Sequence, residues 1–166
     1  MAKKELFKCT EKDGFYSVTE TISEQDIISF AQQIISTRFK RGTKISSPKD
    51  STELLLAKIG HYKHEVFAAL FLDSKHRVIK FETLSEGTID QASVYTREIA
   101  KRALHHNAAA VIFTHNHPSG ITDPSRADIS LTERLVATMN LIGVRTLDHI
   151  IVANNRSQSL AELGYL

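Results

Sequence analysis

The apolar positions of the first third of the chain have both strand and helix periodicity. Along residues 1–44, the pattern predicts two short strands joined by a turn at Lys12–Gly14. A helix should follow, with Thr21 and Glu24 as its capping box. A further short helix is expected over residues 51–59, where apolar side chains recur at helical spacing.

The remaining two thirds alternate between strand-like and helix-like segments. We expect strands at 64–72, 77–82, 108–117 and 145–153, helices at 93–106 and 125–141, and a short polar turn near the C-terminus. The strand at 108–117 is nearly continuously apolar, which is typical of burial on both faces. Strands and helices in this loose alternation predict the α/β class, as an αβα layered domain with a mixed β-sheet.

Length and composition narrow the class of protein. The chain has 166 residues, of which 42% are hydrophobic and 24% charged, as expected of one globular domain. A polar connection around residues 39–52 divides it into an N-terminal extension, 1–44, and a main domain, 45–166. The single cysteine, Cys9, excludes an internal disulfide and a multi-cysteine metal site. With no membrane-length apolar run and no leader-like N-terminus, we expect a cytoplasmic protein.

The strongest chemical signal is a pair of histidines at the end of the strand at 108–117. His115 and His117 are two residues apart, so both imidazoles leave the same face, with their backbone positions about 6.7 Å apart. Asn116 points the other way. Two imidazoles at this separation can converge on one metal ion, although polar residues are also common where a strand meets water.

A helix start follows the histidines after a tight turn. Ser125 and Asp128 lie three residues apart in its first turn and share one face, so Asp128 could supply an oxygen ligand. Two histidines and a carboxylate leave one position for water, the pattern of a catalytic zinc site. The same Ser125–Asp128 spacing also fits a capping box without a metal.

Hydrolysis at such a site needs a carboxylate to accept the proton of the water and return it to the leaving group. Glu65 is the best candidate, because it opens an otherwise apolar strand and shares a face with Phe67. The alternative is that Glu65 lies on an exposed strand end. Ser125 could in addition donate a hydrogen bond to the oxyanion that forms in acyl transfer.

These residues resemble the signature of the JAMM (MPN-plus) metalloproteases, a glutamate on an earlier strand followed by H-x-H-x7-S-x2-D. His115, His117, Ser125 and Asp128 match it without a gap. Within that superfamily the segments HEVFAALFLD, REIAKRALHHNAAAVI, HNHPSG and PSRADISLTERL are most similar to RadC-like proteins, over about residues 45–166. The resemblance implies a JAMM/MPN domain of cytidine-deaminase-like architecture. Residues 1–44 show no pattern of the helix-hairpin-helix module that longer members of the family carry. The chain therefore resembles the short, single-domain form of the family.

The resemblance also implies a function, a zinc-dependent hydrolase that cuts peptide or isopeptide bonds. One Zn²⁺ with a bound water would lie on His115, His117 and Asp128, with Glu65 as acid/base and Ser125 as oxyanion donor. The family name suggests a link to DNA repair, although a net charge of +2 gives little support for DNA binding. The alternatives are a non-enzymatic interaction module with the same fold and a metal-dependent nuclease acting on DNA. The oligomeric state is not predicted.

Overall fold

The computed structural model describes residues 6–10, 12, 15–87 and 94–166. Contacts divide the chain into two compact units, Met1–Thr37 and Arg38–Leu166. The domain boundary predicted between residues 44 and 45 stays a prediction.

The first unit consists of the two strands and the helix that the sequence predicts. Strand β1 (Phe7–Cys9) pairs antiparallel with β2 (Tyr16–Val18), and α1 (Glu24–Arg38) follows; most of the predicted turn between the strands lies outside the described residues. The predicted capping box of Thr21 and Glu24 is wrong. The chain repeats the same spacing two residues later, and there the amide of Asp26 donates to Ser23 Oγ (3.2 Å) while the amide of Ser23 donates to Asp26 Oδ2 (2.9 Å).

The second unit is built on a mixed five-stranded sheet in the order β4-β3-β5-β6-β7. Its strands are β3 (Val66–Leu72), β4 (Val78–Glu86), β5 (Ala110–Asn116), β6 (Arg145–Ala153) and β7 (Arg156–Ser159). β5 and β6 are parallel, whereas the other neighbouring strands are antiparallel. The sequence pattern missed β7, a short polar strand that exists because it pairs with the edge of β6.

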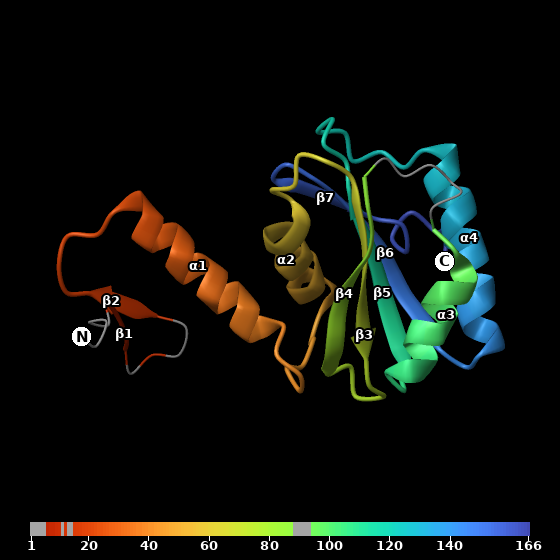
Figure 1. Cartoon of the computed structure of the whole chain (residues 1–166), viewed down its shortest axis with the longest axis horizontal. Helices are drawn as coiled ribbons and strands as arrows, with labels where there is room; N and C mark the ends of the chain where they lie inside the picture. The colour runs from red at the N-terminus through yellow and green to blue at the C-terminus, as the bar shows by residue number, and fades with distance from the viewer. Residues whose placement is uncertain (1–5, 11, 13–14, 88–93) are drawn as a thin grey trace. The chain divides into compact units, whose positions relative to one another are not determined.

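Helices cover both faces of this sheet, as Figure 1 shows. Helix α2 (Pro48–Ile59) packs on one face, and α3 (Thr96–His105) and α4 (Arg126–Leu141) pack on the other. The odd-numbered residues of β3, such as Phe67, face α3 and α4, whereas even-numbered ones, such as Leu70, face α2. The predicted αβα class with a mixed sheet is therefore confirmed.

Helix α2 begins earlier than the sequence pattern predicts. Ser47 is its N-cap, in a capping box with Asp50, and Pro48 occupies the first turn, where its missing amide hydrogen is no loss. Ser51, the predicted start, is buried inside the helix and donates to the carbonyl of Pro48 (2.7 Å). None of the helices in the described part of the chain has the length and apolarity that crossing a membrane requires.

Candidate metal centre

His115 is buried near the C-terminal end of β5, where the pairing of β5 with the parallel strand β6 ends. The apolar residues of β5 up to Phe113 are fully covered, and Thr114, His115 and Asn116 continue the buried run. The Thr114 hydroxyl donates to the carbonyl of Ile150 on β6 (2.8 Å), which satisfies a polar group inside the sheet. His115 pairs with Phe67 of β3 in register and so faces the layer of α3 and α4.

The first turn of α4 supplies the carboxylate. Ser125 is the N-cap, and its Oγ accepts from the amide of Asp128 (3.1 Å). In return, Asp128 Oδ2 accepts from the Ser125 amide (2.8 Å) and from its hydroxyl (2.6 Å). The capping box and the cluster thus coexist, because the cap uses Oδ2, which also lies 3.6 Å from His117 Nε2, and leaves Oδ1 facing His115.

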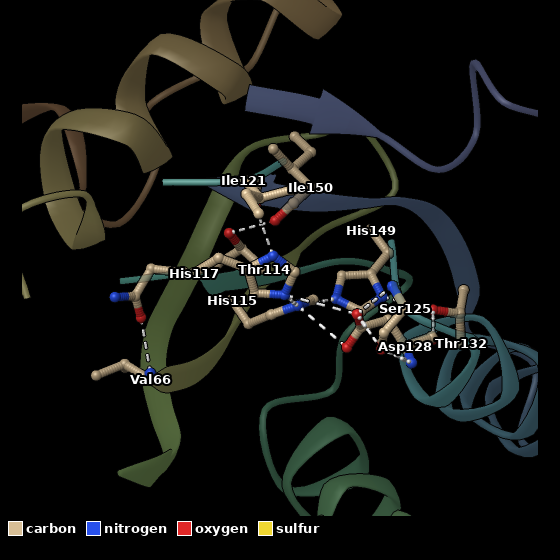
Figure 2. A network of polar contacts seen from close by, with 11 residues as sticks. Val66, Thr114, His115, His117, Ile121, Ser125, Asp128, Thr132, His149 and Ile150 are labelled. Carbon is tan, nitrogen blue, oxygen red and sulfur yellow. Dashed lines mark hydrogen bonds and ion pairs between the residues drawn. The ribbon is translucent and has the colours of Figure 1, made fainter. Parts of the chain in front are cut away.

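Figure 2 shows the side chains of His115, His117 and Asp128 gathered at one point. Nε2 of His115 lies 2.9 Å from Nε2 of His117 and 3.2 Å from Asp128 Oδ1, and one ligand atom from each residue lies within 4.8 Å of the others. His117 Nδ1 donates to the carbonyl of Ile121 (2.7 Å), so in the neutral ring Nε2 keeps a free lone pair. Two nitrogen donors and one oxygen donor that converge in this way could hold a metal ion.

The charges of this cluster stabilise one another. Burial opposes ionisation of Asp128, but the contacts with His115, His117 and Ser125 outweigh it and hold the pKa of the carboxyl well below its usual range. The hydrogen bond with Asp128 raises the pKa of His117 against the opposing effect of burial, and the charge of Glu65 adds to the rise. Asp128 is thus ionised and offers a charged oxygen to a cation.

Glu65 lines the same cavity, which has a volume of about 320 Å³. The residues around it come from the start of β3, the end of β5, the following loop and α4: Glu65, His115, His117, Ser119, Ile121, Asp123, Ser125, Ala127, Asp128 and Leu131. The strand itself begins at Val66, so Glu65 precedes it and is partly exposed. A carboxylate in this place keeps contact with solvent while it faces the ligand cluster.

Asn116, between the two histidines, holds the segment that carries Glu65. Its side chain leaves the opposite side of β5, as predicted, where Oδ1 accepts from the amide of Val66 (2.7 Å) and Nδ2 donates to the carbonyls of His64 (3.0 Å) and Tyr62 (3.1 Å). Three of the four hydrogen bonds that an asparagine side chain can make are therefore used. The sequence alone gives no sign of this role, because the three partners are backbone groups, which every residue carries.

A second residue that sequence reasoning did not place at the site is His149 of β6. It is fully buried, its Nε2 lies 2.8 Å from His115 Nδ1, and its Nδ1 lies 2.6 Å from the Thr132 hydroxyl of α4. Burial, with the nearby His115, holds the pKa of His149 well below its usual range, so the ring is neutral. Only the register of β6 against β5, in which His149 pairs with Phe113, could have identified it.

Asp148, the neighbour of His149, has a separate structural role. Its carboxylate accepts from the Ser159 hydroxyl (2.7 Å) and the Ala161 amide (3.2 Å). Asp148 therefore links the C-terminal turn to β6. Among the described residues, its hydrogen bonds include none with His115 or His117.

Most of this chain is similar to known proteins. Residues 45–165 match the family model described as the RadC-like JAB domain. A protein of Azotobacter vinelandii named "UPF0758 protein" is 50% identical over 142 residues, which cover 86% of this chain and 63% of that protein. Proteins of the same name from Vibrio cholerae and Vibrio campbellii are 46% and 41% identical, over 91% and 98% of this chain and 95% and 75% of their own lengths. The chain thus spans less than two thirds of some relatives and nearly all of another.

Proposed function

The chain belongs to the RadC-like JAB domain family, and from that premise we propose that it is a zinc-dependent hydrolase, a metallopeptidase or isopeptidase. The observation that carries the proposal is the convergence of His115, His117 and Asp128 in one cavity with Glu65. A closed structural zinc site has four protein ligands, whereas three ligands beside a cavity leave a position for water and substrate.

In this proposal His115, His117 and Asp128 hold a single Zn²⁺. When bound, the ion supplies Lewis-acid chemistry, polarising a carbonyl and lowering the pKa of a water molecule toward neutrality. The partners at Nδ1 of both histidines leave each Nε2 to face the ion, and Asp128 is ionised, as ligation by a carboxylate requires.

Glu65 is the proposed proton carrier. Its carboxylate takes a proton from the attacking water and transfers it to the leaving amine, so that the amine departs neutral. Asn116 keeps the Glu65 segment in position through the amide of Val66, the first residue of β3.

Ser125 is the proposed donor to the oxyanion of the tetrahedral intermediate. In the structure its single hydroxyl hydrogen goes to Asp128 Oδ2, so the role requires that hydrogen to turn toward the substrate. Its position at the rim of the cavity supports the assignment.

The charge of the cavity favours a peptide over a nucleic acid. Among the described residues, its lining includes the carboxylates of Glu65, Asp123 and Asp128 but no lysine or arginine. A nucleic-acid backbone brings one negative charge per nucleotide and is bound mainly by Lys and Arg. A peptide or isopeptide bond, which is neutral, meets no such repulsion.

The test is to measure zinc content and cleavage of a peptide library with the purified protein. Glu65→Gln should retain zinc and lose cleavage by 10²-fold or more, the scale of general acid–base catalysis. Asp128→Ala should lose both, and Glu133→Gln, which changes an exposed glutamate of α4, should lose neither.

Three results would contradict the proposal. Wild-type protein without zinc would remove its basis, and undiminished cleavage by Glu65→Gln would remove the role of Glu65. Cleavage of plasmid DNA that disappears with His117→Ala, without peptide cleavage, would favour the nuclease instead.

A further inference from the structure

Behind the metal ligands, a chain of hydrogen bonds leads from α4 through β6 to β5. We propose that Thr132 and His149 are positioning residues that hold His115 in the tautomer whose Nε2 is free to bind a metal ion. Figure 2 shows His149 between Thr132 and His115. The inference rests on the proposed metal centre, and it concerns how that centre is kept ready for the ion.

The first step is the direction of the Thr132 hydroxyl. Its Oγ1 lies 2.7 Å from the backbone carbonyl oxygen of Asp128, one helical turn earlier. A carbonyl oxygen only accepts, and a hydroxyl has one hydrogen to give. The Thr132 hydrogen is therefore committed to Asp128, and Oγ1 has only its lone pairs left for any other partner.

The second step assigns the tautomer of His149. Its Nδ1 lies 2.6 Å from Thr132 Oγ1, and since that oxygen can only accept here, Nδ1 carries the hydrogen. The ring is fully buried, where a second proton would leave a costly charge. Nε2 of His149 is consequently bare and acts as an acceptor.

The tautomer of His149 determines that of His115. His149 Nε2 lies 2.8 Å from His115 Nδ1, so His115 donates from Nδ1. In a neutral imidazole one nitrogen donates and the other accepts, which leaves Nε2 of His115 with a lone pair. That atom is the one that points at His117 and Asp128.

The orientation of the His149 ring is fixed by packing against aromatic side chains. The His149 ring meets the ring of Phe67 edge-on, at 5.6 Å and 81°, and that of Phe113 at 6.3 Å and 76°. His149 and His115 lie on neighbouring strands of the sheet, and Thr132 lies on the helix that also carries Asp128. We call Thr132, His149 and His115 the relay. Each of its members is held by a helix or a strand rather than by a loop.

Loss of the Thr132 hydroxyl should reverse the relay. Without an acceptor at Nδ1, His149 gains by moving its hydrogen to Nε2, where it donates to His115 Nδ1. The hydrogen of His115 then lies on Nε2, at the position the metal needs. Zinc binding would have to restore the first tautomer and leave His149 Nδ1–H buried without a partner, so affinity falls although Thr132 touches no ligand atom of the ion.

The experiment compares Thr132→Val, which keeps the shape and removes the hydroxyl, with Thr132→Ser, which keeps the hydroxyl. Long-range ¹H–¹⁵N correlation spectra of the zinc-free protein at pH 8.5 report which nitrogen of His149 carries hydrogen. We expect Nδ1–H in the wild type and in Thr132→Ser, and Nε2–H in Thr132→Val. Competition with a chromophoric chelator should show zinc binding weakened about 10- to 100-fold in Thr132→Val, the range for such supporting hydrogen bonds, and within about threefold of wild type in Thr132→Ser.

Two results would overturn the inference. One is Nε2–H at His149 in the wild type, a measurement that needs no variant and stands even if Thr132→Val does not fold. The other is equal zinc affinity in the folded Val and Ser variants. If the wild type binds no zinc at all, the proposed function fails, and the spectra of the zinc-free protein still decide the relay.

Discussion

Removal of the Asn116 side chain tests whether this residue, and not the apolar strand alone, holds the segment before β3. In Asn116→Ala the amide of Val66 and the carbonyls of Tyr62 and His64 lose their partners, at 2.7, 3.1 and 3.0 Å. The Val66 contact is fully buried, and the other two are partly buried. At about 1 kcal/mol net for each bond, with more for the buried amide, the free energy of unfolding should fall by about 3 kcal/mol.

Chemical denaturation monitored by circular dichroism measures this loss. Asn116→Asp is the informative companion, because its carboxylate still accepts from Val66 but donates to neither carbonyl, so its loss should be similar or larger. Asn140→Ala, at an exposed position of α4, should change the free energy of unfolding by about 0.5 kcal/mol or less.

Zinc content adds a second readout for the same variant. Asn116 leaves the opposite side of β5 from His115 and His117, so folded Asn116→Ala should bind zinc while its peptide cleavage falls, because Glu65 is no longer held in place. A loss of stability below 1 kcal/mol, or loss of zinc with cleavage intact in the remaining loaded protein, would refute this reasoning.

Four further outcomes are expected at the cluster itself. Asp128→Asn should fold and lose zinc in an elemental assay, because the neutral amide keeps the size of the side chain but lacks the charge of a carboxylate ligand, and undiminished zinc would contradict the role of that charge. Ser125→Ala should lower the free energy of unfolding by about 1 kcal/mol through loss of the N-cap, and a change below 0.3 kcal/mol in denaturation would contradict the capping geometry. The pKa of His117 is raised above its ordinary value of 6.5, so its proton competes with zinc already above pH 6.5. As the pH is lowered from 8.5, zinc affinity should therefore begin to fall before pH 6.5 is reached. A pH-independent affinity would argue against His117 as a ligand. Removal of zinc by a chelator should lower the melting temperature, since an ion at 100 times its Kd stabilises the folded state by about 2.7 kcal/mol; an unchanged melting temperature would contradict binding to the native fold.

The sequence by itself determined the class of the fold and the candidate ligands. Apolar periodicity located β3, β5, β6 and α4 to within a few residues, because burial of a strand or of one helix face imposes a local repeat. The two-residue spacing of His115 and His117 and the first-turn position of Asp128 are also local, so the convergence of these three residues, which could hold a metal ion, could be predicted without coordinates.

Only the tertiary structure decided what supports these ligands. Sheet order and register brought His149 beside His115, and a register shift in the β5–β6 pair makes alternation along β6 misleading: Leu147 packs with the α2 face although it is two residues from His149. Asn116 acts on backbone groups about fifty residues away, and Thr132 of α4 acts through the ring of His149 on β6. Contacts of this kind depend on which segments the sheet places side by side, and no local periodicity encodes that choice.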